Sequence, residues 1–442
     1  MVKLRKYRRF YSLHNRYLAI SIRDVKRAQK LKRLIIICAL ALQLLYDDED
    51  EDDEEDIEDI EIILQLIILR RRRLIYEAPQ IPRRQRVNIP RSIESFGATD
   101  FANLFRFRSH NDIRRVLALW DFPVNQEGKV LISDRGHYMF PEELFLLSIR
   151  RLSSVSTLDE LSRNDFKSTE YSRISRGFNW FVKFTAQKFR LKFSNQSLSF
   201  FEPRFPIYAE AIRKKVNEKG PCNFQQGQFV VACFIDCNNT KIARPGAGPD
   251  GPGPNAPRRD PGGIEQEALY NGWLRSTGIK HQTVEMPDGL CGPIFGPSSC
   301  RHNDLWSFRE SRIAAAFDAV QREPRNAAGV PKPTQYVMYG DGIYVGGPHI
   351  KSRHVGQNLP EHLRQENFGM ASARESIEWS YGEIKQFFPF LSMKEKLKIS
   401  NMPLGDIYFT CFLLRNCYNC LYHSKTSLTF DCPPPRLEDY MA

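Results

Sequence analysis

The pattern of apolar and polar positions divides the chain into a helical stretch followed by a stretch in which strands and helices alternate. Apolar residues recur at helical spacing over residues 96–215. This spacing and its capping residues predict helices over 111–120, 141–152, from 157 onward and over 170–189. The last two carry a basic set that is compatible with a helix-turn-helix facing phosphates, although a plain bundle with a basic outer face fits equally well. The basic set is Lys167, Arg173, Arg176 and Lys183.

The pattern changes from residue 221 onward. A nearly continuous apolar run, rich in Val and Phe, covers 228–235 and stops at Asp236, which is typical of a buried central strand. Further short strands are predicted at 279–284, 290–295 and 335–339, and helices at 307–321, 373–388 and 407–422. Strands that alternate with helices predict an α/β core over 221–425.

Charge is distributed in blocks along residues 1–95. Residues 1–33 hold 12 Lys or Arg and one Asp, residues 47–56 are all acidic, and residues 70–73 are all Arg. Blocks of like charge repel, so we expect a flexible tail here. Its basic clusters fit a nuclear-import signal. A solvated tail whose acidic block neutralises its basic flanks, or a mistaken gene start, would give the same pattern.

Neither a membrane nor a disulfide framework is predicted. The apolar runs at 34–46 and 57–69 are too short or too interrupted by charge, since a membrane-spanning helix needs about 20 apolar residues. Ten cysteines are scattered along the chain without a secretory signal, which favours reduced thiols in the cytosol or nucleus. A net charge of +12 favours a polyanionic partner, nucleic acid before acidic membrane.

Three acidic residues stand where an α/β core would bring them together. Asp236 and Asp341 each follow a predicted strand, and Glu378 lies on a predicted helix. Ligands gather at strand ends in open α/β sheets, and carboxylates that meet there repel unless a cation lies between them. Magnesium prefers oxygen ligands, and two such ions about 4 Å apart assist phosphodiester cleavage. The pattern therefore predicts a site for Mg²⁺ or Mn²⁺, with two ions expected.

The helix that carries Glu378 has two distinct faces. Arg374, Glu378 and Lys385 lie at offsets of 0, 4 and 11 and so share one face. The neighbouring stripe is apolar and should face the core. It consists of Ile377, Tyr381, Ile384 and Phe388. The carboxylate would then stand at the rim of the buried face beside cations suited to DNA phosphates, although an ordinary amphipathic helix with a surface Arg–Glu pair would look the same.

Six motifs follow one another in the second half of the chain. They are Phe234-Ile235-Asp236-Cys237, Tyr270-Asn271-Gly272-Trp273, Gly278-Ile279-Lys280-His281-Gln282-Thr283-Val284, His302-Asn303-Asp304, Gly340-Asp341-Gly342-Ile343-Tyr344, and Arg374, Glu378 and Lys385 spaced as R-x3-E-x6-K. Each motif alone is weak evidence. The ordered set resembles the DDE superfamily endonucleases of PIF/Harbinger-type transposons, strongly over residues 221–425 and loosely over 100–190.

The resemblance implies an RNase H-like catalytic core preceded by a helical, helix-turn-helix-like region. It implies that the catalytic, metal-binding carboxylates are Asp236, Asp341 and Glu378, with 36 residues between the last two. It groups Asp304 with the metal ligands, although a loop aspartate that caps the following helix is an equally good interpretation. It further implies that Arg374 and Lys385 position DNA phosphates. Residues 426–442 are expected to form a C-terminal tail.

The activity implied by the resemblance is that of a nuclear transposase. Such an enzyme cleaves a phosphodiester at a transposon end and joins the 3′ hydroxyl to target DNA, acting as a homo-oligomer on DNA, with a Myb-like DNA-binding protein as a possible accessory. Two alternatives stay open. One is a transposase-derived DNA-binding or scaffolding protein without catalysis, and the other is a host nuclease that shares the same site.

Other candidate sites have weaker support. A possible zinc set lies in a run that we expect to be a buried helix, where cysteine is an ordinary core residue. The set is Cys417, Cys420, His423 and Cys432. Residues 244–263 are rich in Pro and Gly and predict a long solvent loop. Trp273 and Trp306 could stack on a base, but packing within the protein is the preferred prediction for both.

Overall fold

The computed structural model describes residues 91–166, 170–219, 229–245, 267–322, 335–344, 349–399 and 402–442. Contacts divide the chain into two units, Met1–Arg86 and Val87–Ala442, and the described residues all belong to the second. The predictions for the charge blocks and apolar runs of residues 1–90, for Lys167 and for most of the Pro/Gly loop lie outside the described residues. The 3-10 helix η3 (Ile93–Ser95) buries Ile93 completely, so folded structure begins before the predicted boundary at residue 95.

The first half of the second unit is helical, as predicted. Its α-helices are α4 (Ala98–Phe105), α5 (His110–Trp120), α6 (Pro141–Leu152), α7 (Leu158–Glu160), α8 (Tyr171–Lys188), α9 (Leu198–Phe201) and α10 (Phe205–Asn217). Short turns of other helix types join them: η4 (Leu161–Asp165), η5 (Arg190–Phe193), η6 (Asn195–Ser197) and η7 (Glu202–Arg204). The sequence did not predict the hairpin of β1 (Val130–Ser133) and β2 (His137–Met139) between α5 and α6.

Two local signals in this region are confirmed. Thr157 and Glu160 form the expected capping box, in which each side chain accepts a hydrogen bond from the other residue's backbone N–H. The apolar stripes predicted for α5 and α8 are buried except at Leu117, which is partly buried. The buried members are Ile113, Val116 and Trp120 on α5, and Ile174, Phe178, Phe181 and Val182 on α8.

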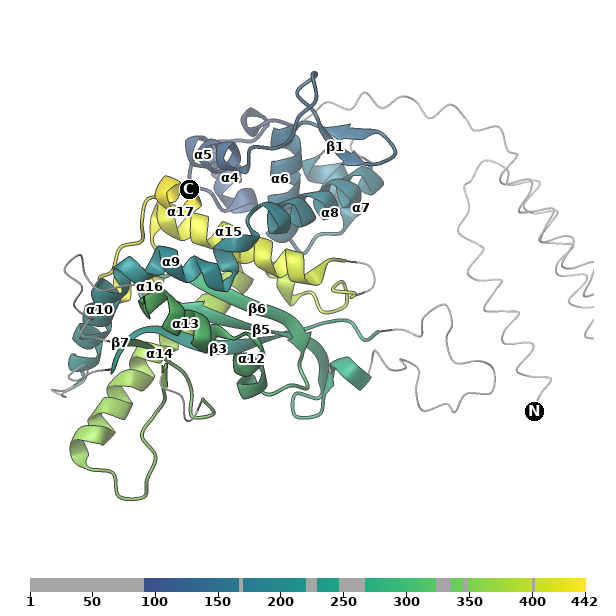
Figure 1. Ribbon diagram of the computed structural model, residues 1–442. Helices are drawn as coiled ribbons and strands as arrows, with labels where there is room; N and C mark the ends of the chain where they lie inside the picture. The colour runs from purple at the N-terminus through teal and green to yellow at the C-terminus, as the bar shows by residue number, and fades with distance from the viewer. Residues whose placement is uncertain are drawn as a thin grey trace, which may run out of the picture. The chain divides into compact units, whose positions relative to one another are not determined.

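A mixed sheet forms the centre of the second half, which makes the fold α/β as predicted (Figure 1). Its strands are β3 (Phe229–Lys241), β4 (Tyr270–Asn271), β5 (Ser276–Glu285), β6 (Cys291–Ser299), β7 (Gln335–Tyr339) and β8 (Ile350–Lys351). The order across the sheet is β6-β5-β3-β7-β8, with β4 paired to the start of β5. β5 is antiparallel to both of its neighbours, β6 and β3, whereas β7 runs parallel to β3 and β8 runs parallel to β7.

The central strand β3 is longer than the sequence predicted. It continues through Asp236 to Lys241, because its second half pairs with β5 after the pairing with β7 has ended. The polar residues in this half do not belong to an apolar run, so the sequence pattern did not predict them as part of the strand, but they have hydrogen-bond partners. Asn238, for example, is buried and donates from Nδ2 to the Tyr408 hydroxyl at 3.3 Å. The prediction that the strand stops at Asp236 was therefore wrong.

Helices cover both faces of the sheet, and alternate residues of β5 show which helices lie where. Lys280 and Gln282 reach the segment formed by α12 (Asp304–Glu310) and α13 (Ile313–Arg322). Thr283 and Glu285 reach α14 (Glu361–Phe387) and α15 (Leu404–Tyr422) on the opposite face. α15 also packs against α8, so it lies between the helical region and the sheet (Figure 1).

Three predicted boundaries need correction. The helix expected over 307–321 is two helices, α12 and α13, separated at Arg312, whose φ of 53° is left-handed and incompatible with a continuous α-helix. α14 begins at Glu361 rather than at 373. Residues 426–442, expected as a tail, fold back onto the body as the rest of α16 (Lys425–Thr429) and as α17 (Leu437–Met441), whose Tyr440 is buried.

The helical region and the sheet belong to one compact unit rather than to separate domains. Tyr422 at the end of α15 donates to Asp112 on α5 at 2.7 Å and accepts from the backbone N–H of Arg108 at 3.0 Å. Among the described helices, none combines the length and apolar character that a membrane crossing requires.

Candidate carboxylate site

Asp236 and Asp341 stand at matching positions on neighbouring parallel strands. Phe234 of β3 pairs with Tyr339 of β7, and each aspartate lies two residues beyond this pair. Neighbouring strands lie about 4.8 Å apart and side chains alternate faces, so residues two steps beyond a paired position start out on the same side. The register therefore brings together two acids that are distant in sequence, as their positions after predicted strands indicated.

Asp236 is held by contacts on both of its carboxylate oxygens. Its Oδ1 accepts a hydrogen bond from the backbone N–H of Cys237 at 2.8 Å. Its Oδ2 lies 3.3 Å from Nη1 of Arg374 on α14. Tyr381 belongs to the buried stripe of α14, and its hydroxyl donates to the Asp236 carbonyl at 3.1 Å. Because the Asp236 side chain is only 16% exposed, these contacts fix its position.

Asp341 lies in a tight turn directly after β7. Its Oδ1 accepts from the backbone N–H of Ile343 at 2.9 Å, and its carbonyl accepts from the backbone N–H of Tyr344 at 3.1 Å. The turn requires a glycine at 340, because a Cβ there would lie 2.5 Å from the buried ring of Tyr344. The motif Gly340-Asp341-Gly342-Ile343-Tyr344 is thus a device that fixes the backbone of Asp341.

Glu378 is brought to Asp236 by an arginine between them. Nη2 of Arg374 lies 3.4 Å from Oε1 of Glu378, one helical turn along α14, while Nη1 of the same guanidinium contacts Asp236. The predicted faces of this helix are confirmed, since Ile377, Ile384 and their stripe are buried and Glu378 is exposed. One guanidinium therefore spans the interval between the two carboxylates.

The electrostatic environment of Asp236 disfavours its charged form. Burial is the largest cause and raises the pKa of its carboxyl to about 6. The hydrogen bond from Cys237 and the charge of Arg374 act in the opposite direction, whereas the negative charges of Asp304 and Asp341 raise the pKa further. Asp304 and Asp341 are therefore close enough to disfavour the charge of Asp236, and a nearby cation would relieve this repulsion.

Asp304 has a definite partner of its own. Its Oδ1 accepts from Nζ of Lys280 at 2.6 Å, and this lysine is nearly inaccessible in the middle of β5. The helix cap is the preceding residue, Asn303, whose side chain accepts from the backbone N–H of Trp306 at 2.8 Å. The interpretation of Asp304 as the cap was therefore wrong, and its charge balances a buried lysine at the edge of the site.

The predicted DNA-binding residues fall into two groups. Arg374 lies within the site, and Lys385 is exposed further along the same helix. Arg173 and Arg176 lie on α8, which packs against α6 and α15 rather than on the sheet. Arg173 is turned inward, with Nη2 at 3.3 Å from the fully buried carboxylate of Glu143, and Arg176 is only partly exposed. The structure does not bring α8 and the acids into one surface.

Arg353 is a neighbour of the site that no motif indicated. A Cβ placed on Gly342 would lie 3.0 Å from Nε of Arg353, so the guanidinium packs on the turn that holds Asp341. This exposed arginine comes from the loop between β8 and α14. A sequence pattern could not identify Arg353 as a neighbour of the site, because its position depends on the course of the loop between β8 and α14.

The described ranges contain no group of three or more His, Cys, Asp or Glu side chains gathered tightly enough to hold a metal ion. This holds for the zinc candidates as well as for the acids. Cys417 is buried within α15, with its Sγ 3.6 Å from the Met441 sulfur, and His423 is exposed beyond the helix end. The expected buried helix is confirmed for this cysteine.

The two tryptophans of the motifs behave differently from one another. Trp306 stacks on the ring of His302, with centroids 3.7 Å apart. Trp273 is 94% exposed at the turn between β4 and β5, so the prediction that it packs within the protein was wrong.

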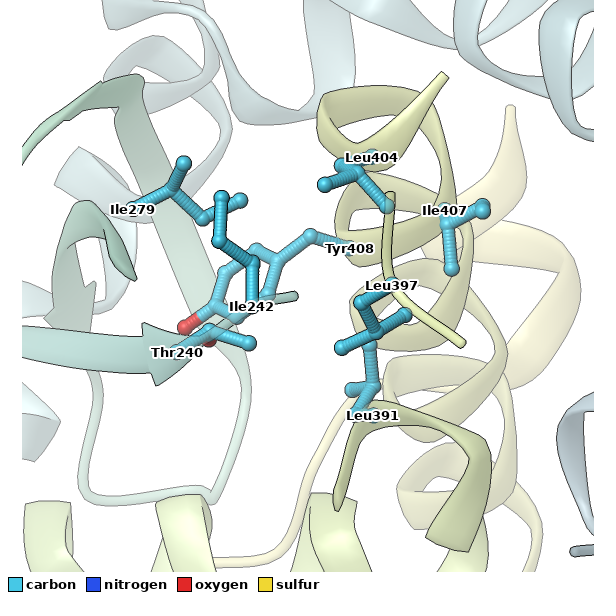
Figure 2. A pocket seen from close by; sticks show the side chains of 8 residues that line it. All are labelled: Thr240, Ile242, Ile279, Leu391, Leu397, Leu404, Ile407 and Tyr408. Carbon is cyan, nitrogen blue, oxygen red and sulfur yellow. The ribbon is translucent and has the colours of Figure 1, made fainter. Parts of the chain in front are cut away.

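A small hollow lies at the far end of β3 from the apolar half of that strand. Its walls are almost entirely aliphatic and include Ile242, Ile279, Leu397 and Ile407, with Tyr408 at one side (Figure 2). Such a lining offers no set of groups for catalysis.

No protein-family model matches the chain, and neither a curated protein nor a solved structure matches it.

Proposed function

We propose that this protein is a metal-dependent DNA endonuclease of the DDE transposase type. The observation that carries the proposal is the meeting of Asp236 and Asp341 across the β3–β7 register, with Glu378 joined to Asp236 through Arg374. Two aspartates from separate parts of the chain would not be expected to lie this close at a part-buried position for stability alone, because their repulsion costs free energy.

The sheet supports an RNase H-like core as part of this proposal. Its three antiparallel strands lead into two parallel ones. Asp236 lies within the central strand β3 just past the end of its pairing with β7, and Asp341 lies just after β7. A long helix, α14, then crosses the same face and delivers the third acid. This arrangement agrees with the order in which the six motifs occur along the chain.

The donor chemistry of the site fits magnesium or manganese. The available ligand atoms are carboxylate oxygens, which these ions prefer, and the charge of Asp236 is poorly compensated in its buried setting. Asp236 and Asp341 would hold the ions, with Glu378 completing the set after a rotamer change that its 61% exposed side chain permits. Bound ions would supply activation of the attacking oxygen and stabilisation of the leaving one.

The cations around the acids would position the DNA strand. Arg374 presents a planar guanidinium that suits phosphate as well as carboxylate, and Arg353 and Lys385 extend this positive rim on either side. Asp304 lies at the edge of the site, where its ion pair with Lys280 holds its carboxylate in place. A separate role for Arg173 and Arg176 in DNA binding has less support, since Arg173 pairs internally.

A nicking assay on supercoiled DNA with manganese tests the proposal. Asp341→Asn and Glu378→Gln should each abolish nicking. Their matched controls are Asp134→Asn, in an exposed turn, and Glu375→Gln, exposed on the same helix as Glu378, and both should cut like the wild type. Equal nicking by all variants would refute the proposal. Absence of nicking in the wild-type protein would instead favour the DNA-binding or scaffolding alternative.

Transposition itself is a further part of the proposal. It includes joining of the cleaved end to target DNA, a homo-oligomeric assembly on DNA, a possible Myb-like accessory protein and a nuclear location. Terminal inverted repeats on both sides of the gene would support it. Their absence, together with manganese-dependent nicking, would favour a host nuclease that uses the same carboxylates.

A further inference from the structure

The turn between β4 and β5 presents a tryptophan to solvent. Trp273 is 94% exposed, although tryptophan is among the residues that proteins bury most on average. Tyr270 at the start of the same turn is 42% exposed. An aromatic surface of this kind has a large free-energy gain available from contact with a flat partner.

This turn is held rigidly rather than left loose. The Asn271 side chain binds on both sides: Nδ2 donates to the carbonyl of Cys300 at the end of β6, and Oδ1 accepts from the backbone N–H of Leu274 at 2.9 Å. Asn271 also pairs with Ser276 in the sheet. The backbone on either side of Trp273 is therefore held in place, which lowers the entropy cost of binding at this turn.

Basic side chains surround the base of the turn. Ile242 donates from its backbone to the carbonyl of Thr277, and Ala243 donates to the carbonyl of Leu397, so three segments meet here. Exposed cations on these segments include Lys241, Arg275, Lys394 and Lys398, and the exposed acid Glu395 lies among them. We call Trp273 and these four cations the basic turn surface.

We propose that the basic turn surface binds single-stranded DNA, with Trp273 stacking on an unpaired base and the cations contacting the adjacent phosphates. Stacking on aromatic side chains combined with a positive surface is the usual chemistry of single-strand binding, because every base has a flat face. The bases of an intact duplex are already stacked and do not offer that face to a protein side chain. The excess of cations makes a purely apolar partner a poor fit.

The basic turn surface is separate from the carboxylate site. Asp236 pairs with Thr283 on β5, whereas Lys241 of the surface pairs with Gly278, five residues earlier on that strand, and Trp273 lies before Ser276. At about 3.3 Å per residue, five residues span roughly 17 Å, the length of about five base pairs. The inference thus goes beyond the proposed cleavage and does not require it, since binding at this distance needs no metal and no catalytic acid.

Binding of the full-length protein to labelled oligothymidylate of about 20 nucleotides, without divalent metal, tests the inference. Trp273→Ala should weaken binding at least about fivefold, and Trp273→Phe should recover most of the loss because it keeps a stacking ring. The matched control is Tyr171→Ala, which removes a ring that is 63% exposed on α8, and it should bind like the wild type. Arg275→Asn suits the left-handed backbone at 275 and should reduce the salt dependence of binding by about 0.7 in slope.

Three results would overturn the inference. They are wild-type affinity in Trp273→Ala, an equal loss in Tyr171→Ala, and an equal loss of affinity for a duplex of the same length. The outcome is distinguishable from that of the proposed function. If Asp341→Asn abolishes nicking while Trp273→Ala binds normally, cleavage stands and this surface fails, whereas the converse result would leave a single-strand-binding protein without the nuclease.

Discussion

A buried histidine should make this protein less stable in mild acid than a variant that lacks that histidine. His281 on β5 is 2% exposed, and its ring stacks on Tyr408 with centroids 3.7 Å apart and planes 5° apart. Within the described residues neither ring nitrogen has a hydrogen-bond partner. Burial therefore lowers the pKa of His281 from 6.5 to about 3, because the charged ring would lose its hydration without compensation.

The size of the effect follows from proton linkage. Between pH 6.5 and pH 3 the unfolded chain binds a proton at His281 that the folded protein does not, so the free energy of unfolding decreases as the pH falls. The slope is about 1.4 kcal/mol per pH unit, and the accumulated loss from this residue is about 2 kcal/mol at pH 5. Above pH 6.5 the contribution to stability is fully retained.

His281→Phe keeps a ring for the stacking contact and removes the titration. Urea unfolding measures the free energy of unfolding at several pH values between about 7.5 and 5. The difference in this free energy between the variant and the wild type should shift by about 2 kcal/mol in favour of the variant from the upper to the lower pH. The comparison is made between variants because Asp236 and Asp288, whose pKa values burial raises to about 6, change stability in the opposite direction as the pH falls.

The control is His423→Phe, which replaces an exposed histidine and should keep the wild-type slope. If His281→Phe and the wild type lose stability in parallel on acidification, the reasoning from burial is refuted. His281→Gln provides a second non-titrating side chain in case the larger ring does not fit beside Gly296.

Three further changes test other parts of the structure. Gly340→Ala should reduce manganese-dependent nicking without unfolding the protein, because the new Cβ meets the ring of Tyr344 and displaces the turn of Asp341; unchanged nicking contradicts this account. Arg415→Met should lower the free energy of unfolding in urea by about 3–5 kcal/mol, because it leaves the carboxylate of Glu285 buried without its ion-pair partner. Adding Glu285→Gln should recover part of this loss, and no recovery contradicts the pairing. Arg353→Gln should weaken binding of duplex DNA in a salt-dependent manner, and unchanged affinity at low salt excludes Arg353 from the phosphate contacts.

Periodicity predicted most helices of this fold because their buried faces are made within the helix itself. The stripes on α5, α8 and α14 needed no knowledge of their partners, and each is buried. The break between α12 and α13 was missed, since it depends on a left-handed backbone at Arg312 that no glycine signals. The hairpin of β1 and β2 was also missed, because strands this short carry too little alternation to be recognised.

The candidate site was predictable only in part for a related reason. Asp236 and Asp341 could be found because each follows an apolar run that is itself a strand signal. The partners that give these acids their environment come from other segments. Arg353 arrives from a loop, and the pairing of Lys280 with Asp304 depends on where α12 begins. The sequence pattern also did not predict which side chains are exposed, and Trp273 shows that apolar character alone does not predict burial.

The position of the site follows from a change of partner along β3. Up to Phe234 the strand pairs with β7, which ends at Tyr339, and its pairing with β5 begins at Phe234. Beyond that point β3 continues with β5 alone, so one edge becomes open at the level of Asp236. A backbone edge in an interior sheet is normally covered, and here the turn of Asp341 and the side chain of Arg374 occupy that side. If β7 were two residues longer, it would pair along Asp236 and replace that turn. The early end of β7, rather than any feature of β3, therefore makes room for the carboxylates to meet.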